Sequence, residues 1–425
     1  MESEMLLGDI AEIVMGQSPS GETVSENHQG IGLLNGPTEF GIKSPAVKQF
    51  TSDPKKICRN GDLLFCVRGS TTGRMNWADN EYAIGRGLAA IRGRNNYSNI
   101  FVRASIENCL PSLLSQATGS TFPNVSRELL HSLKLPYVSD KDAHRITFIL
   151  SSIENKIFNL LDTNKTLESI AQAIFKSWFV DFDPVRAKQQ GVECAGIDKA
   201  TADLFPNSFV ESELGLIPKD WGYGTLGEIT DFQNGYAFNS KQWTNDGNQV
   251  LKIGNVKPGI VEYEGCSFVS NETTVGLERF KLHRGDLLVG MTGYVGETGL
   301  VYKNNKSAYL NQRVGKISPK QGTKSRSYIY CCVRNKGYKQ YAETLAQGSA
   351  QANISGKDLL SYPIVIPNKR CIDLFETNIY PIIDKILNNV ETSKDLAAIR
   401  DTLLPRLISG KLDLSNIEEQ LEGVA

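Results

Sequence analysis

Residues 146–178 read ITFILSSIENKIFNLLDTNKTLESIAQAIFKSW, and apolar residues recur there at alternating steps of four and three. Only Asn164 interrupts a series that lasts for more than four heptads. This period is typical of the seam of a coiled coil. Thirty-three helical residues would form a rod of ~50 Å, which needs a helical partner. The apolar positions are Ile146, Leu150, Ile153, Ile157, Leu160, Leu167, Ala171, Ile174 and Trp178.

A second segment repeats this seam at an offset of 229 residues. The simplest partner for each rod is the other rod of the same chain, and we expect them to pair antiparallel. Asn164 either fixes the register, as polar seam residues do, or is a tolerated polar residue near the rod surface. The second seam has apolar Phe375, Ile379, Ile382, Ile386, Leu396, Leu403 and Leu407, with Asn389, Ser393 and Arg400 at weaker positions.

The repeat extends beyond the rods. GSTFPNVS at residues 119–126 returns as GSAQANIS at 348–355, and both octets lead into Leu-Leu and a short apolar run closed by Pro. NGDLLF around Asp62 matches RGDLLV around Asp286, and LLGDIAEIVMGQ from Leu6 matches TLGEITDFQNGY from Thr225. A period of about 220–230 residues is too long for a solenoid and indicates a duplicated domain.

Each copy begins with about 135 residues of short apolar runs and Gly-rich turns, which favour a compact, strand-rich domain. The predicted fold is therefore α+β: two strand-rich α/β domains joined by two long antiparallel helices that form a coiled coil, with an internal pseudo-twofold repeat. If the rods are antiparallel, we expect each domain to cap an opposite end. The predicted segments are a first domain (1–140), a long helix (141–180), a linker (181–222), a second domain (223–367), a second long helix (368–410) and an acidic tail (411–425).

Composition limits the class of protein. The 425 residues are 40% hydrophobic and 22% charged, as in ordinary globular proteins of two or three domains. No apolar run approaches the ~18 residues of a membrane span, and the acidic N-terminus lacks a signal-peptide pattern, so we expect a cytoplasmic protein. Eight Cys without a CxxC pair and four His show no metal-ligand spacing, and we expect reduced thiols and no metal.

Charge is unevenly distributed although the net charge is −1. Residues 279–339 contain 13 Lys and Arg against two acids, and residues 61–103 contain six Arg against three acids. Such concentration indicates a cationic face; a solvated, loop-rich surface is the alternative.

Two similar domains held apart by a stiff spacer suit a ligand with two similar sites, such as B-DNA, whose groove faces recur every ~34 Å. Arg, Asn, Gln, Ser and Thr read base edges in the major groove, and both copies place such residues on Gly-flanked turns. Because the two sets differ, they predict an asymmetric, split target, although any one residue could be an ordinary turn group. The candidates are Arg68, Ser70, Thr71, Arg74, Asn76, Arg86, Thr121 and Asn124 in the first copy, and Thr292, Tyr294, Asn311, Gln312, Arg313, Gln351 and Asn353 in the second.

Catalytic motifs are missing from the sequence. No Walker phosphate loop, H-E-x-x-H, G-x-S-x-G or [ND]-P-P-[YFW] adenine-methylation motif occurs. The GSTTG turn at residues 69–73 could hold an anion on its backbone N–H groups, or could be a turn without a ligand. We therefore expect no catalysis by this chain alone.

Three segments resemble a known family. FKSWFVDFDPV (175–185), SELGLIPKDW (212–221) and LLPRLISGKLDL (403–414) are similar to conserved regions of the specificity (S) subunit of Type I restriction–modification enzymes. GSAQANIS, followed by LLSYPIVIP, fits that family's target-recognition domains. The resemblance covers essentially the whole chain. One departure is the lack of a Gln before the rods, in SDKDAHRIT and NKRCIDLF, which puts the start of each rod in doubt.

The resemblance implies a non-catalytic subunit that recognises a bipartite DNA target for a defence system against foreign DNA. Two methylation (M) subunits would bind S-adenosylmethionine and methylate adenine, and restriction (R) subunits would use ATP and Mg to cut, so no cofactor is expected on this chain. The alternative is a two-domain scaffold that binds proteins rather than DNA. Candidate contacts with M subunits are Phe175, Trp178 and Phe179, taken as exposed, with Leu403 and Leu407; Trp178 could equally pack against the partner helix.

Overall fold

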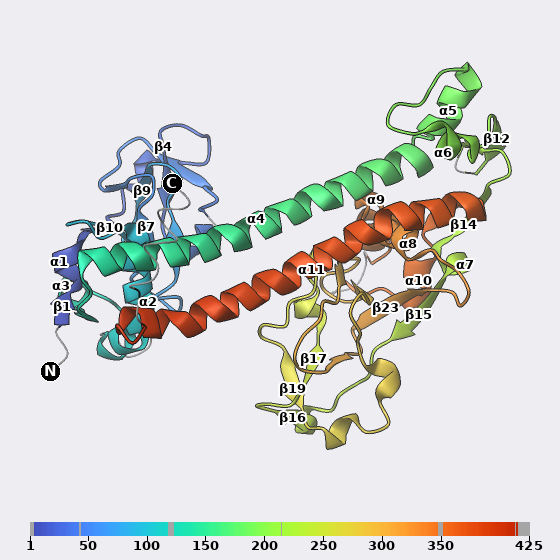
Figure 1. Cartoon of the computed structure of the whole chain (residues 1–425). Helices are drawn as coiled ribbons and strands as arrows, with labels where there is room; N and C mark the ends of the chain where they lie inside the picture. The colour runs from blue at the N-terminus through green and yellow to red at the C-terminus, as the bar shows by residue number, and fades with distance from the viewer. Residues whose placement is uncertain are drawn as a thin grey trace. The chain divides into compact units, whose positions relative to one another are not determined.

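The structure is a computed structural model that describes residues 4–41, 44–117, 123–213, 215–346, 352–412 and 414. The chain divides into two compact units (Figure 1). Unit 1 is Met1–Ile157 with Asp395–Ala425, and unit 2 is Phe158–Lys394. The two longest helices, α4 (Asp140–Phe179) and α11 (Lys369–Ile408), each contribute residues to both units.

Unit 1 contains two main sheets. The first is wholly antiparallel, in the order β2-β10-β7-β8, and the second, β3-β5-β4-β9-β6, has one parallel pair, β4 with β9. Its strands are β1 (Glu4–Leu6), β2 (Ala11–Met15), β3 (Val24–Ser25), β4 (Ile31–Leu34), β5 (Gln49–Thr51), β6 (Ile57–Cys58), β7 (Leu63–Cys66), β8 (Met75–Trp77), β9 (Tyr82–Ile84), β10 (Leu88–Gly93) and β11 (Lys134–Pro136), and its shorter helices are α1 (Leu7–Ile10), α2 (Asn99–Gln116) and α3 (Arg127–His131).

Unit 2 has a similar topology, with sheets in the orders β15-β23-β20-β21-β18 and β16-β19-β17-β22, and the second of these has no strand equivalent to β6. Short β18 pairs parallel with β21 and has no counterpart at the edge of the first sheet of unit 1. The strands are β14 (Gly222–Thr225), β15 (Thr230–Asn234), β16 (Trp243–Thr244), β17 (Asn248–Leu251), β18 (Gly259–Ile260), β19 (Ser267–Val269), β20 (Leu287–Gly290), β21 (Thr298–Leu300), β22 (Ala308–Leu310), β23 (Val314–Pro319) and β24 (Pro363–Ile366), and the helices are α7 (Leu226–Ile229), α8 (Arg326–Arg334), α9 (Lys336–Leu345) and α10 (Gly356–Leu360).

The segment between α4 and unit 2's strands is also ordered. It forms α5 (Asp183–Gln190), α6 (Lys199–Asp203) and an antiparallel hairpin of β12 (Phe209–Ser212) and β13 (Gly215–Pro218). A fold of two mixed helix–strand domains with two long helices confirms the α+β prediction.

The repeated Gly-Asp turn has a structural cause. Gly61 and Gly285 have φ of 85° and 86°, a conformation that favours glycine. The following Asp62 and Asp286 accept backbone N–H bonds from residues three positions earlier, at 2.8 and 2.9 Å. Asp62 also binds Arg92 of β10 through both carboxylate oxygens, at 2.7 and 2.6 Å. These contacts fix the turn that leads into β7, and an equivalent turn leads into β20.

The two long helices pair antiparallel within each unit. In unit 2 the Asn164 amide donates to the Ile386 carbonyl at 3.0 Å, whereas Phe175, further along α4, lies beside Phe375, with ring centroids 6.2 Å apart. In unit 1 Arg400 lies 3.8 Å from Glu154. Partner numbers fall along α11 as they rise along α4, which confirms the predicted antiparallel pairing of these segments.

Each long helix begins at a polar cap rather than at the missing Gln. The Ser139 hydroxyl accepts a bond from the Asp142 N–H at 3.1 Å, and the side-chain Oδ1 of Asn368 accepts one from the Cys371 N–H at 2.9 Å. Ser and Asn are favoured caps because their oxygens satisfy N–H groups that lack a partner in the first turn.

Candidate nucleic-acid interface

The hairpin loop that follows the Gly-Asp strand has the same backbone bonds in both units. In unit 1 Cys66 and Arg74 are joined by an N–H···O bond of 2.8 Å, and Gly73 donates to Cys66 at 2.9 Å. In unit 2 the corresponding bonds join Gly290 to Glu297 at 2.8 Å and Gly296 to Gly290 at 3.0 Å. The two loops are therefore equivalent, although their side chains differ.

Backbone bonds bring two further segments to each hairpin. In unit 1 the Val67 N–H donates to the Gly87 carbonyl and the Val125 N–H donates to the Val67 carbonyl, both at 2.9 Å. In unit 2 the equivalent bonds run from Met291 to Arg313 at 3.1 Å and from Ile354 to Met291 at 2.9 Å. We call residues 67–74, 86–87 and 123–125 loop cluster 1, and residues 291–297, 311–313 and 352–354 loop cluster 2.

Loop cluster 1 contains most candidates of the first copy. Arg68, Ser70, Arg74 and Arg86 are exposed, and Thr71 and Asn124 are half-buried. Asn76 is the exception, because it is only 7% exposed on β8 and its amide donates to the Gly41 carbonyl at 2.8 Å. The Asn76 side chain is therefore buried, and its contact with DNA stays a prediction. Thr121 lies outside the described residues.

Loop cluster 2 contains the candidates of the second copy. Tyr294, Gln312, Arg313 and Asn353 are exposed, and Tyr294 is 64% exposed. Thr292 and Asn311, in contrast, are buried at 7% and 8% exposure, and their contact with DNA stays a prediction. Gln351 lies outside the described residues.

The Asn shared by the two octets ties its segment to the hairpin. In unit 1 Arg68 and Asn124 form an isolated antiparallel bridge, and the Arg68 Nε donates to the Asn124 Oδ1 at 3.1 Å. In unit 2 Thr292 and Asn353 form the equivalent bridge, and the Thr292 hydroxyl donates to the Asn353 Oδ1 at 2.8 Å. The repeated Asn in the sequence was the signal for this contact.

Much of the basic charge in residues 279–339 is neutralised within unit 2. Five of the thirteen basic residues form ion pairs, so the expected cationic face is smaller than the sequence suggests. Arg284 binds Asp384 at 2.6 Å and Glu391 at 2.8 Å on α11, and its hydrogen bond holds the pKa of Asp384 below the usual value. The other four are Lys306 with Asp246, Lys316 with Asp286, Arg334 with Glu168, and Lys339 with Glu297.

Charge is reversed at one equivalent position of the two hairpins. Arg74 of unit 1 is exposed, whereas Glu297 of unit 2 is 7% exposed and binds Lys339 at 2.8 Å. In the GSTTG turn the Thr72 N–H donates to the Gly69 carbonyl at 3.2 Å and the Gly73 N–H donates to the Cys66 carbonyl at 2.9 Å. That this turn holds an anion on its backbone N–H groups stays a prediction.

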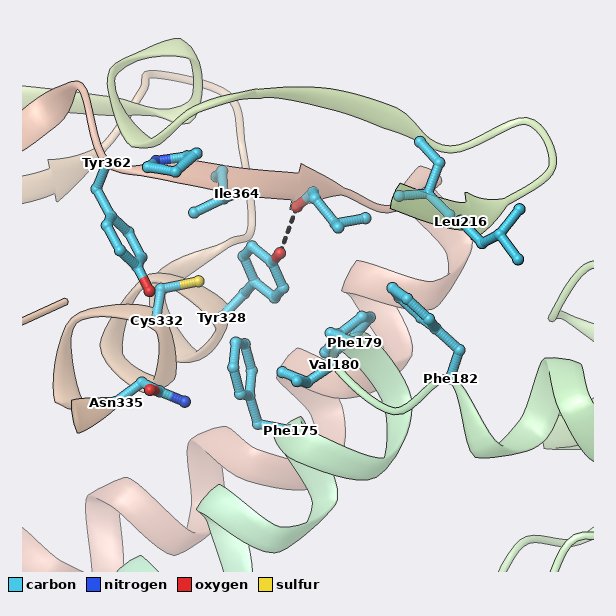
Figure 2. Close-up of a pocket in the computed structure, with 13 residues that line it drawn as sticks. Phe175, Phe179, Val180, Phe182, Leu216, Tyr328, Cys332, Asn335, Tyr362 and Ile364 are labelled. Atoms are coloured by element: carbon cyan, nitrogen blue, oxygen red, sulfur yellow. Dashed lines mark hydrogen bonds between the residues drawn. The ribbon is translucent and has the colours of Figure 1, made fainter. Parts of the chain in front are cut away.

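The aromatic residues predicted to meet a partner are buried instead. Phe175, Trp178 and Phe179 are at most 5% exposed. Figure 2 shows Phe175 and Phe179 beside Tyr328, with ring centroids 5.5 and 5.0 Å away, in the lining of an apolar cavity of about 230 Å³. The premise that these side chains are exposed was wrong, because α8 and β24 cover Phe175 and Phe179, and Trp178 packs against Phe205 and against Phe375 of α11.

Leu407 is also buried, at 2% exposure, and Leu403 is half-buried. Other apolar residues of the long helices are exposed. On α4, Phe158 and Leu161 are 37% and 38% exposed, and Ile170 is 43% exposed. Heptad reasoning missed them because they lie outside the seam, although their apolar character off the seam was a signal.

Among the residues that the structure describes, no group of His, Cys, Asp and Glu could hold a metal ion. No helix within the described ranges is long and apolar enough to cross a membrane. The eight cysteines are free thiols, and burial raises the pKa of Cys58 and of Cys371 to about 11.

Two copies of one strand-rich unit, each with a cluster of hydrogen-bonding side chains, define a duplicated recognition protein. The sequence profile of the Type I restriction modification DNA specificity domain matches residues 2–169 and 218–399, and the chain belongs to this family. The chain is thus a specificity subunit of a Type I restriction–modification system, and the catalytic activity of such systems lies in other subunits.

Individual relatives agree with this assignment. The chain is 24% identical to the Type I restriction enzyme HindI specificity subunit of Haemophilus influenzae, over 86% of this chain and 90% of the relative. It is 22% identical to the MjaVIII specificity subunit of Methanocaldococcus jannaschii, over 97% and 93%. The crystal structure of the S subunit from M. genitalium has the same fold, with a TM-score of 0.54, 15% identity and 96% coverage of both chains.

Proposed function

We propose that unit 1 and unit 2 each bind one half of an asymmetric, bipartite DNA sequence. The observation that carries this proposal is the pair of equivalent loop clusters with unlike side chains. Arg68 corresponds to Thr292, and exposed Arg74 corresponds to buried Glu297. A common scaffold with different donors and acceptors selects different bases, because direct readout depends on those groups.

The role of this chain is to position the DNA duplex. Exposed Arg and Lys side chains hold the duplex by its phosphates, and the groups of the loop clusters choose the base sequence. A target adenine must leave the base stack to be methylated, and we assign that pocket to the M subunits. S-adenosylmethionine, ATP and Mg would be bound by the M and R subunits, and the assembly would act in the cytoplasm.

The long helices offer the contact for M subunits. In unit 2 the seam positions Leu160 and Leu167 are only half-buried, and Phe158 and Leu161 are exposed one turn apart on α4. Exposed apolar residues grouped in this way mark protein interaction sites. These residues replace Phe175, Trp178 and Phe179 as our candidates for the partner contact.

Mapping methylated adenines tests the proposal. The full chain is expressed with its M subunits in a host that lacks adenine methylation, and modified positions are read by single-molecule sequencing. We expect one motif with two unlike half-sites separated by a fixed gap. A single uninterrupted motif, a palindromic motif or no motif would contradict the proposal.

Salt dependence separates DNA binding from a protein scaffold. Phosphate contacts release counterions, so affinity of the complex for duplex DNA should fall ~10³- to 10⁵-fold between 50 and 200 mM salt if six to ten phosphates are contacted. An affinity that does not change with salt would favour the scaffold.

A further inference from the structure

Arg68 has a position that no other basic residue of loop cluster 1 shares. Its side chain is exposed, and its backbone pairs with Asn124 in an antiparallel bridge. The Nε donates to the Asn124 Oδ1 at 3.1 Å, so one edge of the guanidinium is anchored by the protein. The two terminal nitrogens have no partner among the residues that the structure describes, and they remain available to a ligand.

The backbone on both sides of this pair is held in place. Gly69 follows Arg68 with φ of 95°, and the Thr72 hydroxyl lies 2.8 Å from the Gly69 carbonyl oxygen and 3.0 Å from that of Pro123. Thr72 thus links the turn after Arg68 to the residue before Asn124. An arginine on this support loses little side-chain freedom when it binds, which favours a specific contact over a diffuse one.

The chemistry of an anchored guanidinium fits guanine. Two parallel N–H groups match the O6 and N7 acceptors of guanine in the major groove, which is the commonest specific contact of arginine with DNA. Arg74 and Arg86 are exposed too, but their side chains have no anchoring bond to another described residue. Such unanchored arginines suit phosphates, which require charge and tolerate many geometries.

Unit 2 cannot make the same contact at the equivalent position. Thr292 is 7% exposed, and its hydroxyl donates to Asn353. Unit 2 therefore has no guanidinium fork at this position, and an arginine contact with guanine at this position can be made by unit 1 only.

We propose that Arg68 reads a guanine in the half-site bound by unit 1, and that Asn124 is a positioning residue that orients its guanidinium. The inference rests on the proposed function of the two units. A good bidentate pair discriminates between bases roughly 5- to 150-fold, equal to about 1–3 kcal/mol.

The test compares methylated motifs of complexes that contain wild-type chain, Arg68→Ala or Arg68→Lys with the same M subunits. Both variants should lose the requirement for guanine at one position of one half-site by a factor in that range and keep the other half-site. Arg68→Lys retains the charge but not the fork, so it serves if the Ala variant assembles poorly. Arg74→Ala is the matched control, and it should lower methylation at all sites, reduce the salt slope by about 1 and leave the motif unchanged.

The positioning role of Asn124 is tested with one variant that removes its side-chain oxygen acceptor and one that keeps it. Asn124→Leu should relax the same position as Arg68→Ala, whereas Asn124→Asp keeps an oxygen for the Arg68 Nε and should keep the guanine. An unchanged motif in both Arg68 variants, or a relaxed position that is not a G·C pair, would overturn this inference. A wild-type complex without a bipartite motif would instead overturn the proposed function.

Discussion

Some residues singled out in the sequence support the fold, and for others the sequence did not predict whether the side chain is exposed. Asp62 and Asp286 repeat because each closes a turn and pairs with a basic residue on a neighbouring strand. Asn76 had the chemistry of a base reader, but β8 is only three residues long and too short to show alternation between its faces. Residue type predicted the candidates, and the local backbone and packing around each one decided its exposure.

Arg284 should stabilise unit 2 in a pH-dependent way. It donates to Asp384, Glu391 and Asn388 of α11 at 2.6–2.9 Å. Replacing Arg284 by Met removes charge-assisted hydrogen bonds and should lower the free energy of unfolding at pH 7 by about 2 kcal/mol.

The sign of the pH effect follows from Asp384, whose pKa the hydrogen bond with Arg284 lowers in the folded chain. Its stabilising contribution is present above the unfolded pKa of about 4 and is lost as the pH falls. Thermal unfolding of wild type and Arg284→Met should therefore differ more at pH 7 than at about pH 2. Arg279→Met, which removes an arginine that lies over Phe280, is the control. An equal difference in thermal stability between wild type and Arg284→Met at both pH values would contradict the proposed contribution of Asp384.

At the scale of elements, periodicity predicted the long helices well. The heptad seam spans most of α4 and α11, and the helices begin near the expected residues. The sequence did not show that aromatic residues at the end of α4 are covered by α8 and β24, because that packing joins segments more than 140 residues apart. Contacts of this kind depend on tertiary structure, which no local pattern reveals.

Asn164 should stabilise the paired helices through a side-chain hydrogen bond with Asn389. The Asn389 amide donates to its Oδ1 at 2.8 Å, and Asn389 is only 2% exposed. Asn164→Leu leaves that buried amide without its partner, which should cost about 1–3 kcal/mol of stability. The double variant Asn164→Leu with Asn389→Leu should recover most of the loss, because an apolar pair suits the seam.

Urea unfolding of the single and double variants measures this coupling, with Asn159→Leu as a control at an exposed position of α4. A single Asn164→Leu variant more stable than wild type would show that the amide pair is dispensable. Whether the pair also fixes the register of the helices stays a prediction.

At the scale of the whole molecule, duplication explains most of what the sequence could predict. The two copies share the turns, strands and octets that build the fold, whereas the residues between these segments differ from one copy to the other. The offset between equivalent positions drifts from 219 residues at Gly8 and Gly227 to 229 at the octets, as loop insertions require. The recognised bases could not be predicted, because they depend on side-chain geometry in the loop clusters, and the gap set by the long helices stays a prediction.

The central claim is that each unit reads its own half-site. Replacing residues 1–138 by the corresponding residues of another family member, and mapping methylated adenines made by the complex with its M subunits, tests it directly. We expect one half of the motif to change to that of the donor protein while the other half is retained. A motif in which both halves change, or in which neither does, would contradict it.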